Sequence, residues 1–454
     1  MTRHYVISDL HLGMGRINET EWHPLEDFKS DESFHKYLDF IDKDGGDELI
    51  INGDWIDFMQ LEPLAYDPDH LHYSEDGHIL GWTEKDSLAK LESCRAQLAH
   101  KNFFDDLRHF LSSGKKLTII MGNHDPDLFW PGVQAEIISY LNPPEKDRLE
   151  FSQTFVRRGT AHIEHGNQYC SPENRFYNPQ NVFHRSTEDN LERLEMAWGT
   201  IFVMEFFNSI EEEFPFADNI KTQVRAIWLG IKNGWVGGKM AAKFVKFMIS
   251  AGIPWSSITA NVLGPKKTAP HQLIQNLGEP AITAELLKNY GSNPAFKKSF
   301  DDEIARTTNA EWRTLQLQNV RNAELSGPDK RPVTAAELTP DPAGSPVMGV
   351  FRDEPEFRGA TELLKRNRGG EVIFGHTHTE IDGKDPKAKV KNYFNTGTWV
   401  DSLDLSQPGK REILKNIKGP DLKNDAIFDL RLRQVIIDLD DNNATRVSLE
   451  PIKP

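Results

Sequence analysis

The amino-acid sequence predicts an α/β fold with a helical insertion, on three observations. Over the first 170 residues, short β-branched runs alternate with helical patterns, as they do in layered α/β domains. From about residue 172 the apolar residues recur at helical spacing, and strand signals return near residue 371. Since 38% of its 454 residues are hydrophobic, the chain can bury a sizeable core. We therefore expect one α/β domain that a helical cap divides.

Three buried strands are expected before the insertion. They are residues 5–7, 49–51 and 117–120. Each is a short apolar run that ends in a cluster of polar residues, and the carboxyl ends of strands are where α/β sheets bind ligands. Helical spacing predicts helices near residues 34–42 and 85–111. Residues 65–81 have the composition of an exposed loop.

The insertion is predicted to be mainly helical. Its helical patterns cover residues 191–202, 220–231 and 236–247. A proline-rich stretch at 327–346 is typical of a loop or linker. Strand signals follow at residues 371–374, 390–394 and 435–438. The expected divisions are a first α/β part at residues 1–171, the cap with its linker at 172–346, and a second α/β part at 347–454.

Charge and composition argue against several classes of protein. The formal net charge is −16, whereas surfaces that bind nucleic acid are basic, so nucleic acid is not an expected partner. Two cysteines, Cys94 and Cys170, are too few for a disulfide framework. The first strand begins almost at Met1, which leaves no room for a signal peptide. The most apolar stretch is interrupted at Glu205, well short of the ~20 residues of a membrane span. We expect a soluble, cytoplasmic protein without a transmembrane segment.

Residues that commonly bind metal ions gather at the expected strand ends. They are Asp9, His11, Asp54, Asn123, His165, His376 and His378. This mixed set of oxygen and nitrogen ligands suits divalent manganese, iron or zinc, whereas calcium and magnesium prefer oxygen alone. Any one of these histidines by itself would be interpreted as a hydrogen-bonded structural residue. Their combination, each after an expected strand, favours a metal site.

Five motifs together resemble the signature of the calcineurin-like metallophosphoesterases. In chain order they are Asp9-Leu10-His11, Gly53-Asp54-x-x-Asp57, Gly122-Asn123-His124-Asp125, His165-Gly166 and Gly375-His376-x-His378. The resemblance spans residues 9–378 and implies a β-sandwich flanked by helices. The chain departs from the family pattern at Asn167, where relatives often have Asp or His; no ligand is affected.

The resemblance also implies a site for two divalent metal ions that share Asp54. One ion would be held by Asp9, His11, Asp54 and His378. The other would be held by Asp54, Asn123, His165 and His376. Manganese is the expected metal, with iron, zinc or magnesium as alternatives.

The resemblance assigns proton donation to His124, with Asp57 as its partner. Asp57 would orient the imidazole and favour its protonated form, which suits a general acid near neutral pH. The alternative is that Asp57 is only a residue at a helix N-terminus. A hydroxide bridging the two ions would attack phosphorus in line. Arg16 and Arg175 could each bind a substrate phosphate, although a solvated surface arginine is the simpler interpretation of both.

The insertion between His165 and His376 exceeds 200 residues, so we expect it to shape the substrate pocket. Its helix near residues 239–248 has an apolar side and a lysine-rich side, which could contact a lipid or simply pack within the cap. We expect a phosphomonoesterase or phosphodiesterase acting on a small or lipid-like substrate, with peripheral membrane contact as an option. The alternatives are an enzyme like the UDP-2,3-diacylglucosamine pyrophosphohydrolases, which typically have Arg where this chain has His124, and a metal-dependent nuclease. A binding module without activity is the third alternative, but it would have lost some of the seven ligands.

Overall fold

The computed structural model describes most of the two α/β parts and portions of the insertion. The described residues are 2–62, 80–96, 98–169, 174–176, 178–204, 208–211, 219–221, 230–232, 234, 236–250, 270–275, 280–307, 354–367, 370–404, 428–440 and 445–452. Within them, no helix is both long enough and apolar enough to cross a membrane. The expected loop at 65–81 and the linker at 327–346 lie almost wholly outside the described residues, as does most of the expected helix at 220–231.

A six-stranded mixed sheet forms the centre of the molecule, in the order β16-β15-β1-β4-β5-β6. Its strands are β1 (Thr2–Ile7), β4 (Glu48–Asn52), β5 (Lys116–Ile120), β6 (Leu149–Ser152), β15 (Arg433–Leu439) and β16 (Thr445–Pro451). β1, β4, β5 and β6 are parallel, and β15 runs antiparallel to β1. The last strands of the chain therefore complete the sheet that the first strand begins.

A second sheet joins residues from either side of the insertion, in the order β13-β12-β8-β7. Its strands are β7 (Phe155–Arg158), β8 (Ala161–Glu164), β12 (Val372–Phe374) and β13 (Tyr393–Asn395). β12 lies parallel to β8, with Val372 opposite His162, although about 200 residues separate them in the chain. The two α/β parts of the sequence thus form one body.

The two sheets pack face to face because alternate residues of each strand point to opposite sides. Val6, Ile50 and Ile120 of the first sheet share a buried core with Ile163 and Ile373 of the second. The sequence neighbours of Val6, Ile50 and Ile120 belong to a separate core on the outer face of the first sheet, where the helices lie. Each fully buried isoleucine contributes about 1.5–3 kcal/mol by leaving water.

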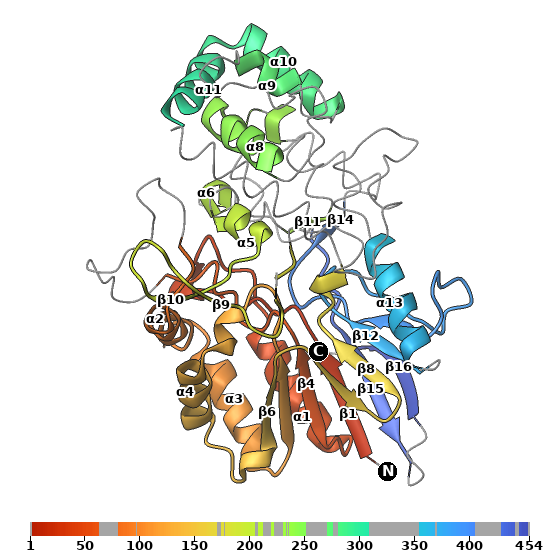
Figure 1. Cartoon of the computed structure of the whole chain (residues 1–454). Helices are drawn as coiled ribbons and strands as arrows, with labels where there is room; N and C mark the ends of the chain where they lie inside the picture. Colours follow the sequence, from red (N-terminus) through yellow and green to blue (C-terminus); the bar gives the residue numbers. More distant parts are fainter. Residues whose placement is uncertain are drawn as a thin grey trace.

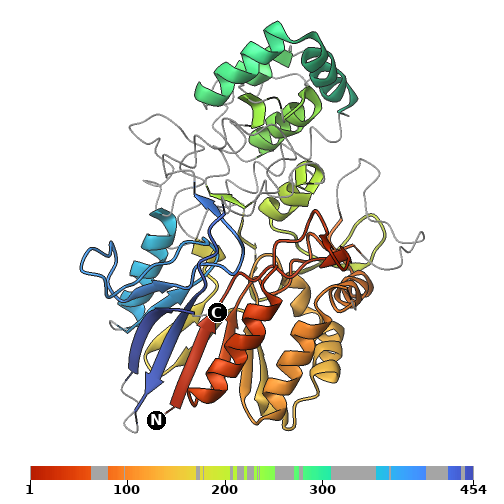
Figure 2. The same ribbon diagram turned by 180° about the vertical axis from the view of Figure 1, so that it is seen from behind.

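Helices cover both outer faces of this sandwich (Figures 1 and 2). On the first sheet lie α1 (Asp31–Lys43), α3 (Lys101–Ser112) and α4 (Pro131–Leu141). α1 buries residues at positions 34, 37, 38 and 41, the spacing that places side chains on one side of a helix. α13 (Glu354–Arg366) packs on the second sheet, where its Ala360 and Leu363 join the core of β12 and β13. The structure is therefore mixed α/β, with a central mixed sheet flanked by helices.

Two predictions of helix need correction. The region 85–111 forms two helices, α2 (Glu84–Cys94) and α3, because the chain turns at residues 95–96 and 98–100 and buries His100. Residues 191–197 are not helical: β10 (Glu192–Leu194) pairs with β9 (Phe183–Arg185), and only α5 (Trp198–Phe202) follows as a helix. At residues 192–194 the pairing of β10 with β9 overrides the local apolar spacing.

Beyond α5, four described helices of the cap lie at the end of the molecule away from the N-terminus (Figure 1). They are α8 (Gly238–Ser250), α9 (Pro270–Gln275), α10 (Pro280–Ser292) and α11 (Pro294–Arg306). α8 packs on α11, with Phe244 and Phe300 buried and Lys246 paired with Glu303 at 2.9 Å. The cap thus supplies a partner for part of the apolar side of α8. The side chains of residues 247–250 lie outside the described part of the chain.

Candidate metal centre

The predicted ligands meet where strands of both sheets end. Asp9 follows β1, Asp54 follows β4, His165 follows β8 and His376 follows β12. Backbone hydrogen bonds fasten these loops together: Asp9 N donates to Gly53 O at 3.1 Å, and Gly375 N donates to His165 O at 3.0 Å. The sandwich therefore brings into one place residues that are more than 350 positions apart.

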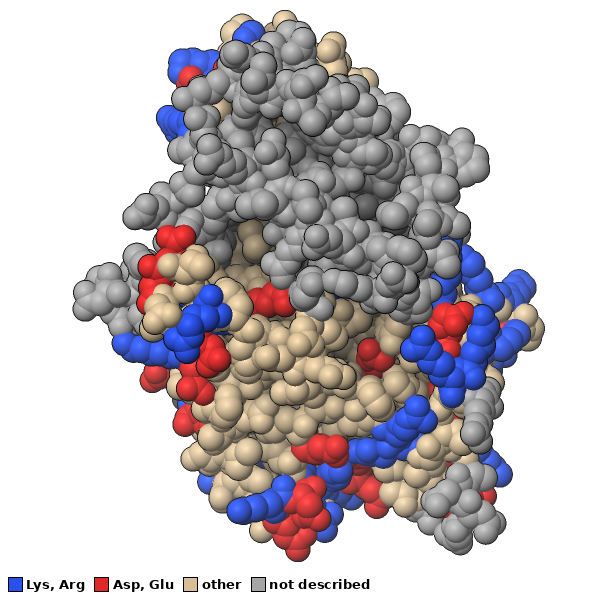
Figure 3. All heavy atoms as spheres, in the orientation of Figure 1, with Lys and Arg blue, Asp and Glu red and all other residues tan. Residues whose placement is uncertain are grey.

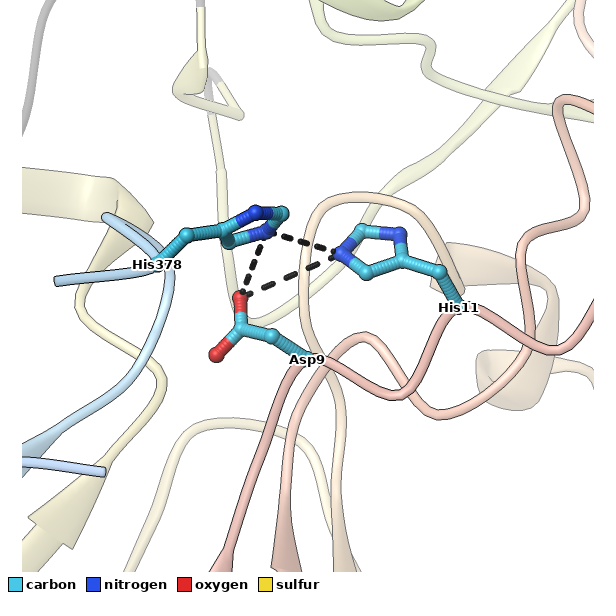
Figure 4. A group of neighbouring side chains, drawn as sticks. All are labelled: Asp9, His11 and His378. Atoms are coloured by element: carbon cyan, nitrogen blue, oxygen red, sulfur yellow. Dashed lines mark hydrogen bonds and ion pairs between the residues drawn. The ribbon is translucent and has the colours of Figure 1, made fainter. Parts of the chain in front are cut away.

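The first group of candidate ligands is Asp9, His11 and His378. Figure 4 shows their polar atoms pointing toward one another. The Nε2 atom of His378 lies 3.4 Å from Asp9 Oδ1 and 3.0 Å from His11 Nε2. His11 Nε2 lies 4.0 Å from the same Asp9 oxygen. One carboxylate oxygen and two imidazole nitrogens converge here at a separation that a metal ion could span.

The second group is Asp54, His165 and His376. Asp54 Oδ2 lies 3.0 Å from His165 Nε2 and 3.9 Å from His11 Nε2, a member of the first group. Asp54 therefore stands between the groups, the place expected for a shared ligand. Asn123 is buried, and its Oδ1 atom has no hydrogen-bond partner among the described residues. A buried acceptor without a donor costs about 1–3 kcal/mol, which a cation would offset.

Backbone strain is concentrated at these ligands. Five of the eight non-glycine residues with positive φ in the described part of the chain belong to the two groups. They are Asp9, His11, Asp54, His376 and His378, with φ between 50° and 69°. Side chains disfavour this left-handed region, and each such residue costs about 1–3 kcal/mol. Strain that recurs at one cluster indicates that the ligand geometry has a function.

Two imidazoles are oriented through the nitrogen that faces away from the cluster. His11 Nδ1 lies 3.0 Å from Asp57 Oδ2, and His165 Nδ1 lies 2.9 Å from Asn52 O. Because these partners accept a hydrogen bond, they place the proton on Nδ1 and leave Nε2 as the free donor of electrons. A neutral ring held in this way is in the tautomer that a metal ion requires. Burial acts to lower the pKa of both rings, but the surrounding carboxylates outweigh it and raise that of His11 to about 10 and that of His165 to about 9. A metal ion that binds here would therefore displace a proton from each ring.

His124 and Asp57 form a pair beside the first group. His124 Nδ1 lies 2.7 Å from Asp57 Oδ2, and the His124 ring meets that of His11 edge to face at 4.5 Å. Asp57 is 1% exposed, whereas the His124 side chain is 20% exposed. Burial alone would raise the pKa of Asp57, but the neighbouring His124 and His11 imidazoles outweigh it and hold that pKa well below its usual range. Asp57 thus stays ionised, and part of the His124 side chain stays exposed.

The surroundings of Asp54 and His376 favour the charge state that each needs to bind a metal ion. Burial acts to raise the pKa of Asp54, but the imidazoles of His165, His124 and His11 lower it well below the ordinary value. Burial and the neighbouring His165 lower the pKa of His376 to about 3. An ionised carboxylate and a neutral imidazole are the forms that bind metal.

The structure assigns positioning contacts to three residues outside the predicted set of site residues. Asp125 accepts hydrogen bonds from Trp55 N at 2.8 Å and Gly122 N at 2.6 Å, so it joins the loops after β4 and β5. Asn395 Nδ2 donates to Gly375 O at 2.7 Å. Asn174 Nδ2 lies 3.1 Å from His376 Nε2. Asp125 could have been inferred from its place next to His124, but no local pattern distinguishes Asn174 or Asn395.

The two arginines predicted to bind phosphate have different surroundings. Arg16 stacks on Trp22, with its guanidinium carbon 3.7 Å from the ring centre, within the hairpin of β2 (Arg16–Asn18) and β3 (Glu21–Trp22). Its described contacts therefore do not involve the ligand groups. Arg175 is buried and directly follows Asn174, which places its backbone beside the second group. A phosphate contact stays a prediction for both residues.

The residues present fit divalent metal ions. A bound cation would explain three observations together. They are the two groups of three candidate ligands, the strained backbone at five of these residues, and the buried amide oxygen that has no hydrogen-bond donor among the described residues. The sequence matches no protein-family model, and no curated protein matches it at a significant level.

Proposed function

We propose that this chain is a dinuclear metal-dependent phosphoester hydrolase of the calcineurin-like type. The observation that carries the proposal is the pair of ligand groups around Asp54 with the His124–Asp57 pair beside them. Bound divalent ions would act as Lewis acids on the phosphate oxygens and lower the pKa of the attacking water. We expect Asp9, His11, Asp54 and His378 to hold one ion. We expect Asp54, Asn123, His165 and His376 to hold the other.

The chain's own contribution to the reaction is proton transfer and orientation. Asp57 accepts a hydrogen bond from His124 Nδ1, so the Nε2 atom of His124 is the one free to give a proton to the leaving-group oxygen. Asp57 also touches His11, so one buried carboxylate aligns a metal ligand and the proton donor together. Such alignment keeps the donor at a set distance from a substrate bound in the metal centre.

Small phosphoesters are the preferred substrate class in this proposal. Phe244, on which a lipid-binding side of α8 would depend, is buried, and α8 packs on α11. On the face shown in Figure 3, the described basic residues lie in separate groups mixed with acidic ones, and they form no broad basic surface. Nucleic acid is therefore not favoured as a substrate.

A hydrolysis screen with manganese-loaded protein tests the proposal. The substrates would be phosphomonoesters, phosphodiesters, nucleotides and nucleotide–lipid pyrophosphates. We expect turnover of at least one class, and loss of that turnover on chelation and in Asp54→Ala. Asp27→Ala is a matched control, since Asp27 is a buried aspartate outside both ligand groups. Hydrolysis that survives complete chelation, or that Asp54→Ala leaves intact, would contradict the proposal.

A further inference from the structure

One ligand of the second group is held from outside the two α/β parts. Asn174, at the start of the inserted segment, places its Nδ2 atom 3.1 Å from His376 Nε2. The two residues are 202 positions apart. The contact therefore links the beginning of the insertion to a ligand loop that follows it.

The contact between Asn174 and His376 has a counterpart at His11 and His165. In those two residues the Nδ1 atom makes the orienting contact, whereas in His376 the Nε2 atom does. In His11 and His165 the Nδ1 atom meets an oxygen, and Nε2 faces the ligand group. In His376 it is Nε2 that meets Asn174, which leaves Nδ1 for an ion. A metal-bound imidazole carries its proton on the other nitrogen, so Nε2–H needs an acceptor. The oxygen and nitrogen of an amide differ by a half-turn of the group, and a half-turn gives Asn174 Oδ1 that role.

A second asparagine holds Asn174 in place. Asn167 Nδ2 donates to the backbone oxygen of Asn174 at 2.8 Å, and Asn167 is 5% exposed. Asn167 directly follows His165-Gly166, so this hydrogen bond fastens the segment around Asn174 to the loop of another ligand. An aspartate at position 167 could not donate this hydrogen bond when ionised. The departure from the family pattern at Asn167 therefore has a physical consequence.

We propose that Asn174 is a positioning residue for His376: its amide oxygen accepts Nε2–H and keeps Nδ1 free for the ion of the second group, while Asn167 anchors Asn174. The inference rests on the proposed function only in requiring that the two groups bind metal. The inference adds a contact through which the start of the insertion orients one candidate metal ligand, His376.

Metal binding by single-residue variants tests the inference without an activity assay. Manganese titrations by calorimetry, checked by metal analysis after dialysis, would give two binding constants for the unaltered protein. Asn174→Ala should weaken one of them about 10–100-fold, the usual effect of losing such a partner, and leave the other unchanged. Asn174→Asp should keep both constants within a few-fold, because a carboxylate also accepts Nε2–H. Asn167→Asp should weaken the same constant as Asn174→Ala, by a smaller factor.

Asn178→Ala is the matched control. Asn178 lies four residues further along, is exposed, and its Oδ1 accepts a hydrogen bond from Gln180 N at 3.2 Å. We expect both manganese constants to be unchanged in this variant. Cobalt substitution adds a spectroscopic readout, since the absorption bands of the affected ion should shift in Asn174→Ala and not in Asn178→Ala. Circular dichroism verifies that every variant is folded.

Two results would overturn the inference. One is an Asn174→Ala variant that binds both ions as tightly as the unaltered protein. The other is an equal loss in Asn174→Asp and Asn174→Ala, which would mean that the amide donates to Nε2. Protein that binds two manganese ions but hydrolyses nothing refutes the proposed function and leaves the inference standing. Protein that binds no manganese refutes both.

Discussion

At the scale of single residues, Asp57 and His124 separate two tasks that a metal centre must perform. Asp57 is fully buried and contacts both His11 and His124, whereas His124 retains 20% of its side-chain exposure. The buried Asp57 aligns the two imidazoles, and the partly exposed His124 can reach a substrate. A change at His124 should therefore affect chemistry without affecting metal binding.

We predict that His124→Ala keeps its manganese but loses turnover by about 10²–10⁴-fold, the usual contribution of a general acid. The loss should be much smaller for p-nitrophenyl phosphate, because its leaving group needs no proton. Steady-state kinetics on good and poor leaving groups, with metal analysis of the same samples, would measure this. Equal losses for both leaving groups would instead indicate that His124 stabilises charge in the transition state.

At the scale of elements, the interface between the two sheets determines where the ligand loops lie. Ile50 of β4 is completely buried in this interface, whereas Ile17 of β2 is 51% exposed. Replacing Ile50 leaves a cavity between sheets that carry ligands on both sides. Replacing Ile17 removes a side chain that is half exposed and leaves no internal cavity.

We predict that Ile50→Ala lowers the free energy of unfolding by about 2–5 kcal/mol. Ile17→Ala should change it by no more than about 0.5 kcal/mol. Urea denaturation followed by circular dichroism would measure both. Similar values for the two variants would mean that the two sheets do not share the core described above.

The start of α3 contains a second buried network, away from the ligand groups. His100 Nε2 lies 3.1 Å from Glu26 Oε2, and its Nδ1 lies 3.2 Å from Asp31 Oδ1. Glu26 also accepts a hydrogen bond from Phe28 N at 2.9 Å. Burial alone would lower the pKa of His100, but Glu26 and Asp31 outweigh it and raise that pKa to about 10. The network thus holds a proton that the unfolded chain releases near pH 6.5.

We predict a stability contribution from His100 that depends on pH. Because the folded pKa is the higher one, the contribution is fully present below about pH 6.5 and is lost as pH rises toward 10. Thermal unfolding of the unaltered protein and of His100→Gln, compared at several pH values, would measure it. The difference in Tm should be largest near pH 6 and should shrink toward pH 10. A difference that stays constant over this range would contradict the proposed charge on His100.

At the scale of the whole molecule, the candidate metal centre joins residues from the two ends of the chain. Ligands of both groups come from residues 9–165 and again from residues 376–378, and they follow strands of both sheets. Ions bound there would contact the folded state only. The stability of the entire α/β body should therefore depend on metal concentration.

We predict that manganese raises the Tm of chelator-treated protein. At 100 times the dissociation constant, one ion would add about 2.7 kcal/mol to the free energy of unfolding. Differential scanning calorimetry across a range of manganese concentrations would measure the shift. Asp54→Ala should show almost none of it. A Tm that manganese does not move would contradict a metal site that spans both parts of the chain.

The local features of this protein could be predicted from its amino-acid sequence. Strands β1, β4 and β5, the helical nature of α1 and α8 and the return of strands after the insertion follow from periodicity that neighbouring residues create. The candidate ligands could be selected from sequence because each directly follows a strand and belongs to a short motif. The structure brings six of the seven into the two groups, and it places the seventh, Asn123, buried on the loop after β5 beside Asp54's partner His124.

Which distant segments meet could not be predicted from the sequence and depends on how the folded chain packs. The pairing of β12 with β8, the strand at β10 in place of a helix, and the contact of Asn174 with His376 all join residues whose local sequence carries no record of the partner. Such contacts depend on packing and on hydrogen bonds between elements, which outweigh local spacing once the chain is compact. For this reason the sequence predicted the candidate metal ligands, whereas the residues that hold those ligands in place emerged only from the fold.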